Sequence, residues 1–355
     1  MNARQVIVAM SGGVDSSTSA ALLKEDGWEV AGVHFLLPCS PRVRLERAAR
    51  ARKIADRLRI PLDLVELDKV FTEKVIRPFL EGYLAGVTPN PCVVCNEVIK
   101  FEYLLRAAVG RGFHFIATGH YARTQQDNGV HQLLRGKDQG KEQSYFLHRL
   151  IQEQISRIVF PLGHLRKDEV RVLAAGMDLP VPSGSESQEI CFIPGDDYRS
   201  FLQSETGMGA EKKGDILTRE GEKVGEHTGP HRYTIGQRHG LGIASSRPYY
   251  VMEIRAEENR IIVGRKEDLY STRVEARDAC WVSGNPPAET RSLLGQVRYR
   301  HKAAPGCLQV LPDGNLIFEF NDPQWAITPG QALVIYRGEQ VLGGGWITEK
   351  TNVEH

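Results

Sequence analysis

The chain has 355 residues, of which 41% are hydrophobic and 25% charged, and its formal net charge is +1. This length predicts two or three domains with substantial cores. A net charge so near zero neither indicates nor excludes a nucleic-acid partner, and no apolar stretch is long enough to cross a bilayer.

The N-terminus leads into the first predicted strand without a secretory leader, so we expect a cytoplasmic protein with no membrane partner. In that compartment the six cysteines are expected to be catalytic, metal-binding or buried rather than paired in structural disulfides.

Strands and helices alternate over the first half of the chain. The apolar runs predict strands at 6–10, 29–37, 62–67 and 115–118, and helices at 16–26, 44–58, 70–85 and 101–110. This order is typical of a parallel sheet with helices on both faces, whose ligand crevice lies beyond the carboxyl ends of the strands.

The segment VIVAMSGGVDSS at residues 6–17 leads from the first strand into the first helix. Glycines let backbone N–H groups approach phosphate oxygens, and a helix N-terminus favours negative charge. The loop lacks the Gly-Lys-Ser/Thr ending of a γ-phosphate loop. It is similar instead to the pyrophosphate loop of enzymes that cleave ATP between the α and β phosphates. The alternative is an ordinary strand-to-helix turn with an N-cap, which needs only one serine.

The predicted helix after the second strand is rich in basic residues, opposed only by Glu46 and Asp56. Such a run is either a solvated helix face or a phosphate-contacting surface, and the sequence leaves both open. Its basic members are Arg42, Arg44, Arg47, Arg50, Arg52, Lys53, Arg57 and Arg59.

The character of the chain changes near residue 205, where glycine and polar residues predict short strands and turns. From about residue 275, alternating runs at 293–300, 307–311, 316–320, 332–336 and 341–346 predict a small antiparallel barrel. We therefore predict a Rossmann-like α/β domain at 1–204, a central, mostly-β module at 205–274 and a C-terminal β-barrel at 275–355.

Two cysteine motifs stand out. Cys92 and Cys95 form a C-x-x-C pair that precedes a predicted helix, where a cysteine pKa is expected to be lowered. Cys191 lies in a predicted short apolar strand. The alternatives are a half zinc site for the pair, although no second pair exists, and a small buried hydrophobe for Cys191. Cys39, Cys280 and Cys307 are interpreted as structural.

The motifs together resemble the bacterial tRNA-specific 2-thiouridylases, a family that thiolates the wobble uridine of tRNA. The matching segments run over the whole chain: SGGVDSS, NPCVVCNEVIKF, ATGHYAR, QSYFL, SQEICFI, YTIGQRHGLGI and VRYRHKA. The resemblance implies an enzyme that uses ATP with Mg²⁺, binds tRNA and receives sulfur from a partner protein.

The resemblance also implies residue roles. The expected ATP-binding residues are Ala9, Met10, Ser11, Gly12, Gly13, Val14, Asp15, Ser16, Phe35 and Gly119. The expected tRNA-contacting residues are Asn90, Pro91, Cys92, Lys141, Glu142, Gln143, Arg298 and Tyr299. Gly119 is alternatively a strand-end turn glycine. Arg298 and Tyr299 are alternatively one barrel strand that exposes the arginine and buries the tyrosine.

In the implied mechanism the C2 oxygen of uridine is adenylated and a persulfide on Cys191 attacks C2. Cys95 then attacks the bridging sulfur, which leaves a Cys95–Cys191 disulfide. Two other hypotheses are kept: a different pyrophosphate-loop ligase, and a tRNA-binding protein without catalysis.

The sequence departs from the family pattern at two positions. Cys92 stands where the family commonly has an aspartate, and Glu142 where it commonly has an aspartate between Lys141 and Gln143. Cys92, Cys95 and Cys191 could together hold a [4Fe–4S] cluster with one open iron, so sulfide on that cluster is an alternative sulfur donor.

Overall fold

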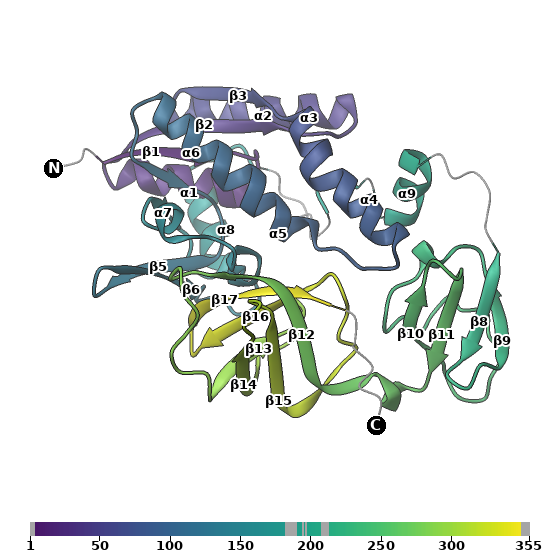
Figure 1. The fold of residues 1–355 in the computed structure, drawn as a ribbon. Helices are drawn as coiled ribbons and strands as arrows, with labels where there is room; N and C mark the ends of the chain where they lie inside the picture. The colour runs from purple at the N-terminus through teal and green to yellow at the C-terminus, as the bar shows by residue number, and fades with distance from the viewer. Residues whose placement is uncertain (1–3, 182–189, 194, 196, 207–212, 349–355) are drawn as a thin grey trace.

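The computed structural model describes residues 4–181, 190–193, 195, 197–206 and 213–348, and contains an α/β part, a small β-module and a closed β-barrel (Figure 1). None of the helices in the described part of the chain has the length and apolar character that crossing a bilayer requires.

A five-stranded parallel sheet in the order β3-β2-β1-β4-β7 forms the centre of the N-terminal part. Its central strand has alternating side chains: Ile7 packs with Phe101 on one face, and Val6 and Val8 pack with Ile54 on the other. Helices therefore cover both faces, as predicted. The strands are β1 (Gln5–Ala9), β2 (Glu29–Leu36), β3 (Leu62–Glu66), β4 (Phe115–Ala117) and β7 (Ile158–Val159).

The main helices of this part are α1, α2, α6 and α8, and two regions contain π-helical turns. The first predicted helix after β3 is three segments, and the cysteine helix continues through a π-helix into α6. The helices are α1 (Val14–Glu25), α2 (Pro41–Leu58), α3 (Asp68–Phe71), η1 (Thr72–Ile76), α4 (Arg77–Leu84), α5 (Pro91–Cys95), η2 (Asn96–Lys100), α6 (Phe101–Gly110), η3 (Ser144–Leu147), α7 (Gln152–Ile155), α8 (Lys167–Gly176) and α9 (Tyr198–Thr206).

The central module is a four-stranded sheet in the order β10-β11-β8-β9, packed around Ile216, Val251 and Ile261. Figure 1 shows it beside α9 and apart from the parallel sheet. Its elements are β8 (Gly214–Thr218), β9 (Lys223–His227), η5 (Pro230–Arg232), β10 (Tyr250–Arg255), β11 (Arg260–Gly264) and η6 (Lys266–Leu269).

The C-terminal strands form an antiparallel barrel around Phe318, Leu333 and Ile335, and pairing of β12 with β17 closes it. The strands are β12 (Tyr270–Trp281), β13 (Leu293–Gln296), β14 (Ala304–Val310), β15 (Leu316–Trp325), β16 (Ala332–Arg337) and β17 (Gln340–Ile347). The predicted strand 293–300 is therefore too long, because the chain turns after Gln296.

A hairpin that our sequence analysis missed joins the barrel to the N-terminal part. Strands β5 (Ala122–Asp127) and β6 (Val130–Arg135) meet at Asn128-Gly129, both with positive φ, which is a typical hairpin turn. Strand β6 pairs with β17, with Leu133 opposite Val341, and so extends the barrel sheet (Figure 1).

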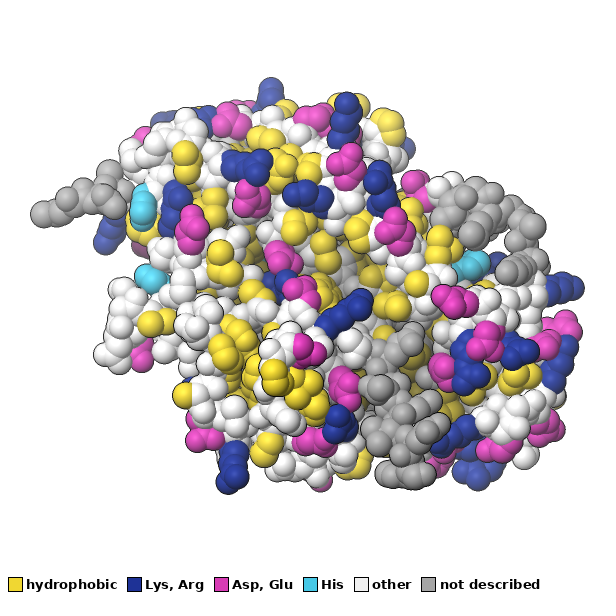
Figure 2. All heavy atoms as spheres, viewed as in Figure 1, with side chains coloured by type: hydrophobic (Ala, Val, Ile, Leu, Met, Phe, Trp, Pro, Cys, Tyr) yellow, Lys and Arg dark blue, Asp and Glu magenta, His cyan; other side chains and the backbone are white. Residues whose placement is uncertain are grey.

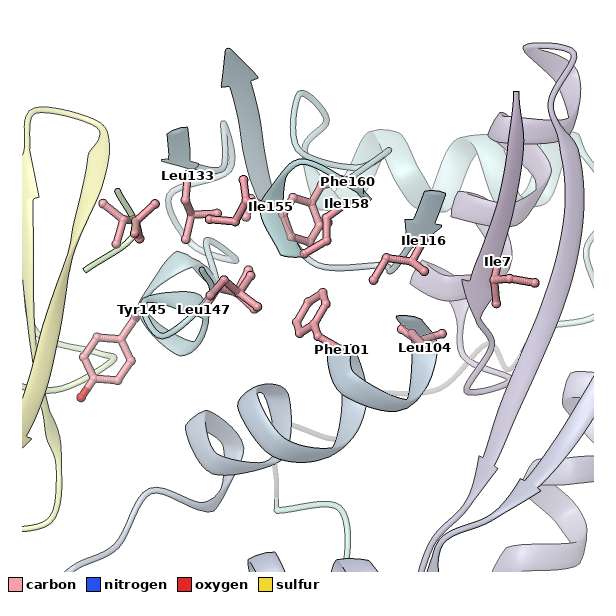
Figure 3. Close-up of a cluster of buried hydrophobic side chains, with 14 of the residues drawn as sticks. Ile7, Phe101, Leu104, Ile116, Leu133, Tyr145, Leu147, Ile155, Ile158 and Phe160 are labelled. Carbon is pink, nitrogen blue, oxygen red and sulfur yellow. The ribbon is translucent and has the colours of Figure 1, made fainter. Parts of the chain in front are cut away.

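One hydrophobic cluster runs from the parallel sheet to the barrel. It begins at Ile7 and Ile116, passes Phe101 and Leu147, and reaches Tyr145 against the barrel strands (Figure 3). Ala332, Val334 and Val341 of the barrel belong to the same cluster. The two parts therefore share a core rather than meeting through a linker.

Removing the hydroxyl of Tyr145 would test how much this shared core contributes to stability. The hydroxyl donates to the carbonyl of Ala332 (2.9 Å) and accepts from the Ala332 N–H (3.2 Å), and the ring is fully buried. We expect Tyr145→Phe to lower the free energy of unfolding by about 1–3 kcal/mol, because buried partners lose a hydrogen bond while ring packing is kept. Urea denaturation measures the change. Tyr270→Phe, at an exposed tyrosine, is the matched control, and equal midpoints for both variants would contradict the prediction.

Candidate active site

A cavity of about 1990 Å³ opens at the carboxyl ends of β1, β2 and β4. The phosphate loop, α5, the Cys191 segment and the turn after β13 all contribute to its lining. Of the residues that the sequence analysis placed in the site, all except Asn90 and Arg298 line this one cavity. Figure 2 shows basic and acidic side chains interspersed over one face of the molecule, so the charge inside the cavity has to be judged from its lining.

The phosphate loop has the geometry that its glycines predict. Gly12 has φ +79°, and a Cβ there would lie 3.1 Å from Cβ of Arg50 and 3.2 Å from the carbonyl of Arg47. Gly13 is the N-cap of α1, and the hydroxyls of Ser11 and Ser16 lie 3.1 Å apart. The first turn of α1 thus faces the cavity, with its N–H groups available to an anion.

Gly119 is needed for close packing rather than only for a turn. A Cβ at this position would lie 2.8 Å from the backbone nitrogen of Ser16 and 2.9 Å from the carbonyl carbon of Asp15. The segment that follows β4 therefore packs directly against the phosphate loop, and any side chain at position 119 would displace the loop.

Asp15, the carboxylate of the loop, is held by two donors. The Tyr121 hydroxyl donates to Oδ1 at 2.8 Å, and Nζ of Lys167 donates to the same atom at 2.6 Å. Burial lowers the pKa of Lys167 while Asp15 counteracts that effect, and burial and Asp15 both raise the pKa of Tyr121. The negative charge of the loop is therefore compensated from within the protein.

The C-x-x-C pair lies in α5, and Asn90 caps this helix by accepting a hydrogen bond from the Val93 N–H (3.3 Å). The expected lowering of the cysteine pKa values is wrong. Desolvation by the surrounding protein raises the pKa of Cys92 to about 11 and that of Cys95 to about 12, although the Cys92 side chain is exposed at the cavity wall. The cost of removing water from the thiolate therefore outweighs the effect of the helix dipole.

Cys191 lies in a turn, not in the predicted strand, since the Ile193 N–H donates to the Ile190 carbonyl (3.0 Å). Phe192 and Ile193 anchor this turn in a buried cluster, against which Cys95 also packs. The Cys191 side chain remains exposed at the cavity wall, yet the surrounding protein raises its pKa by desolvation.

The structure brings the three predicted cysteines together. The charge on Cys191 raises the pKa of Cys92 and of Cys95, the charge on Cys92 raises that of Cys95, and all three are free thiols. Cys39, interpreted from sequence as structural, also lines the cavity.

The arrangement does not favour the iron–sulfur alternative. In the part of the chain that the structure describes, no three histidine, cysteine or acidic side chains are grouped so that they could hold a metal ion. A cluster would need three such thiolates at once.

The predicted tRNA-contacting residues differ in their surroundings. Lys141 and Tyr299 line the cavity, and the Tyr299 ring lies 4.4 Å from that of Phe146. Glu142 is nearly buried, 3.6 Å from Arg135, and burial raises its pKa. Gln143 accepts a hydrogen bond from the Tyr121 N–H (3.1 Å).

Arg298 is turned away from the cavity. Its guanidinium donates to the carbonyls of Ala326 (2.5 Å) and Ile235 (3.2 Å) and to the hydroxyl of Thr328. Arg298 and Tyr299 lie in the turn after β13, so the alternative of a barrel strand is also wrong.

Several further polar residues line the cavity. Arg44, Arg47 and Arg50 belong to the basic run in α2, for which the sequence left a phosphate-contacting surface open, whereas the others were not predicted. His120 lies in the ATGHYAR motif, Lys100 ends the NPCVVCNEVIK segment, and three residues follow Tyr299 in VRYRHKA. The additional lining residues include Arg47, Arg50, Lys100, His120, Arg300, His301 and Lys302.

Comparisons with known proteins cover nearly the whole chain. Residues 4–195 match the family described as tRNA methyl transferase HUP domain. Residues 199–265 match the tRNA methyl transferase PRC-barrel domain, and residues 271–347 match the aminomethyltransferase beta-barrel domain.

Curated relatives match nearly the full length of the chain. The tRNA-specific 2-thiouridylase MnmA of Geobacter metallireducens is 45% identical over 357 residues, covering 97% of this chain and 96% of the relative. The protein of the same name from Chloroflexus aurantiacus is 46% identical over 351 residues, covering 96% and 98%. Among solved structures, U34-tRNA thiolase NcsA from Methanococcus maripaludis with its [4Fe-4S] cluster is 20% identical with a TM-score of 0.35, covering 58% of this chain and 65% of that one. That likeness is too distant to bear on the chemistry.

The raised pKa values predict a steep pH dependence of thiol reactivity. Below its pKa of about 12, the thiolate fraction of Cys95 rises roughly tenfold with each pH unit. We expect the rate of Cys95 alkylation by iodoacetamide to rise in this way between pH 7 and pH 10, followed by peptide mass spectrometry. Exposed Cys307 serves as the internal control. A Cys95 rate that levels off below pH 9 would mean that burial does not control this thiol.

Proposed function

The chain belongs to the family of tRNA-specific 2-thiouridylases, and we propose that it catalyses the ATP-dependent 2-thiolation of the wobble uridine of tRNA. One observation carries the proposal: the phosphate loop and the thiols of Cys95 and Cys191 line the same cavity. A ligase that only adenylates its substrate has no need of two thiols beside its phosphate site.

We assign the binding of ATP to the loop and its neighbours. The backbone N–H groups at the start of α1 would hold the phosphates, and Gly119 keeps the space that the loop requires. Asp15 is the loop carboxylate that would hold Mg²⁺ carried by the phosphates, where the ion would neutralise the departing pyrophosphate. The proposed ATP-binding residues are Ala9, Met10, Ser11, Gly12, Gly13, Val14, Asp15, Ser16, Phe35 and Gly119.

The first chemical step activates the base. The C2 oxygen of uridine attacks the α-phosphorus of ATP, and pyrophosphate leaves. The oxygen, a poor leaving group in uridine, becomes part of AMP, which is a good one. Adenylation thus prepares C2 for attack by sulfur.

The second step transfers sulfur. The terminal sulfur of a persulfide on Cys191 forms a bond to C2. The Cys95 thiolate then bonds to Sγ of Cys191, and the persulfide S–S bond breaks, leaving its electron pair on the sulfur at C2. Collapse of that pair into C2=S expels AMP, and Cys95 and Cys191 remain as a disulfide that an external thiol must reduce.

We propose that tRNA enters between the α/β part and the barrel, with the target base turned out toward the thiols. Lys141, Gln143 and Tyr299 would contact it, beside Pro91 and Cys92. Asn90, Glu142 and Arg298 make contacts within the protein, and for these we propose support of the tRNA-contacting segments. A partner protein would deliver the persulfide in the cytoplasm. We propose three units: an ATP-binding catalytic domain at 1–204, a central tRNA-binding module at 205–274 and a C-terminal β-barrel domain at 275–355.

Replacing the two thiols tests the proposal. We expect Cys95→Ser and Cys191→Ser to abolish 2-thiouridine formation, at least a hundredfold below the unmodified protein, because serine cannot carry or accept persulfide sulfur. Both variants should still release pyrophosphate when ATP and tRNA are supplied. Cys307→Ser is the control, at an exposed cysteine outside the cavity. Full thiolation by either active-site variant would leave an ordinary ligase as the better description, and no pyrophosphate release from any protein would favour a tRNA-binding protein.

Cys92 separates the persulfide route from the cluster route. Under the persulfide route we expect Cys92→Ser to retain activity within about tenfold, since its thiol forms no bond in either step. Protein purified without oxygen should then contain little iron and be active with a persulfide donor. Near-stoichiometric iron that is lost together with activity in Cys92→Ser would instead establish the cluster.

A further inference from the structure

We propose that Lys100 is the cation that stabilises the Cys95 thiolate during sulfur transfer, an inference that rests on the proposed function. Lys100 ends η2, the π-helical turn that begins directly after Cys95, and its side chain is half-buried. It lines the cavity together with Cys92, Cys95 and Cys191. π-Helical turns often occur at functional sites, and this one ends in a lysine five residues after the proposed nucleophile.

The charge of Lys100 is not cancelled by an acid. Among the residues that the structure describes, no carboxylate pairs with Lys100, whereas Lys167, beside the phosphate loop, is paired with Asp15. The acid of its own π-helical turn, Glu97, is engaged by Arg149 at 2.7 Å. A half-buried ammonium without an anionic partner, set beside thiols, is suited to compensating a charge that appears during the reaction.

His120 holds this ammonium in place without neutralising it. Nε2 of His120 lies 3.3 Å from Nζ of Lys100, and Nδ1 lies 2.7 Å from the Thr118 hydroxyl. Burial keeps the pKa of His120 well below its usual value, so the ring is neutral. With the proton on Nδ1 directed at Thr118, Nε2 accepts from Lys100, which remains a cation.

The electrostatic surroundings single out Cys95. Lys100 lowers the pKa of all three cavity thiols, against the larger opposing effect of burial. Arg47 of α2 lowers that of Cys191, and its guanidinium donates to the Cys191 carbonyl at 3.3 Å. For Cys95, Lys100 is the one cation among the causes of its shift, while Cys92 and Cys191 oppose ionisation. When Cys95 loses its proton to water and attacks Sγ of Cys191, Lys100 would compensate the thiolate.

Alkylation of the two thiols in charge variants tests the inference. In the absence of ATP and tRNA, we expect Lys100→Gln to slow iodoacetamide alkylation of Cys95 about tenfold or more at pH 8, because a shift of one pKa unit changes the thiolate fraction tenfold. Lys100→Arg keeps the charge and should restore the rate to within about threefold of the unmodified protein. Arg47→Gln is the matched control, and should slow Cys191 while leaving Cys95 unchanged.

Structural damage to a variant can be detected separately. If the substitution loosens the structure, iodoacetamide would alkylate the partly buried Cys280 faster. In that case Lys100→Met replaces Lys100→Gln, because the methionine side chain preserves the packing of the lysine stem. A Cys95 rate that is unchanged in a folded neutral variant would overturn the inference, as would an equal loss in Arg47→Gln. Because the assay uses neither substrate, it is separate from failure of the proposed function, which would appear as no 2-thiouridine from the unmodified protein.

Discussion

The site depends on the hydrophobic core that the parallel sheet shares with the barrel. Pairing of β6 with β17 extends the barrel sheet into the N-terminal part, and one cluster continues from Ile7 to Val341. Because interiors are densely packed, such a core permits little relative motion of the two parts. The phosphate loop, at the end of β1, and the turn carrying Tyr299, after β13, are consequently both held in the lining of one cavity.

The cysteine helix is positioned from the same side. Thr88, just before it, donates from its N–H to the Pro329 carbonyl (3.1 Å) and accepts from the Gln331 side chain (2.9 Å). The Asn90 amide reaches the Gln331 side-chain oxygen (3.4 Å). A barrel turn therefore fixes the entry to α5, which explains why Asn90 lies outside the cavity although its neighbours Pro91 and Cys92 line it.

Desolvation is the common electrostatic feature of the cavity. It raises the pKa of Cys92 and Cys95, lowers that of His120 and raises that of Glu142. In each case desolvation favours the neutral form of the group. Asp15 is paired with Lys167, and the proposed reaction would supply an anionic partner for Lys100. Desolvation thus disfavours the thiolates at rest, and under the proposed mechanism the charge of Lys100 compensates Cys95 when it ionises.

Local patterns were sufficient for much of this protein. The apolar runs predicted the α/β class, the barrel and four of the five strands of the parallel sheet, whereas the two-residue strand β7 was not predicted. SGGVDSS, Cys95 and Cys191 were predicted to share a site, and they line one cavity. Motifs and hydrophobic periodicity are patterns of neighbouring residues, which is why the sequence reveals them. Errors arose where distant residues decide the outcome. The β6–β17 pairing, the orientation of Arg298 away from the cavity and the raised pKa of Cys95 each depend on groups far apart in the chain. The sequence determined which chemical groups are present, and only the tertiary structure decided their burial, partners and charge, since these are set by packing between segments.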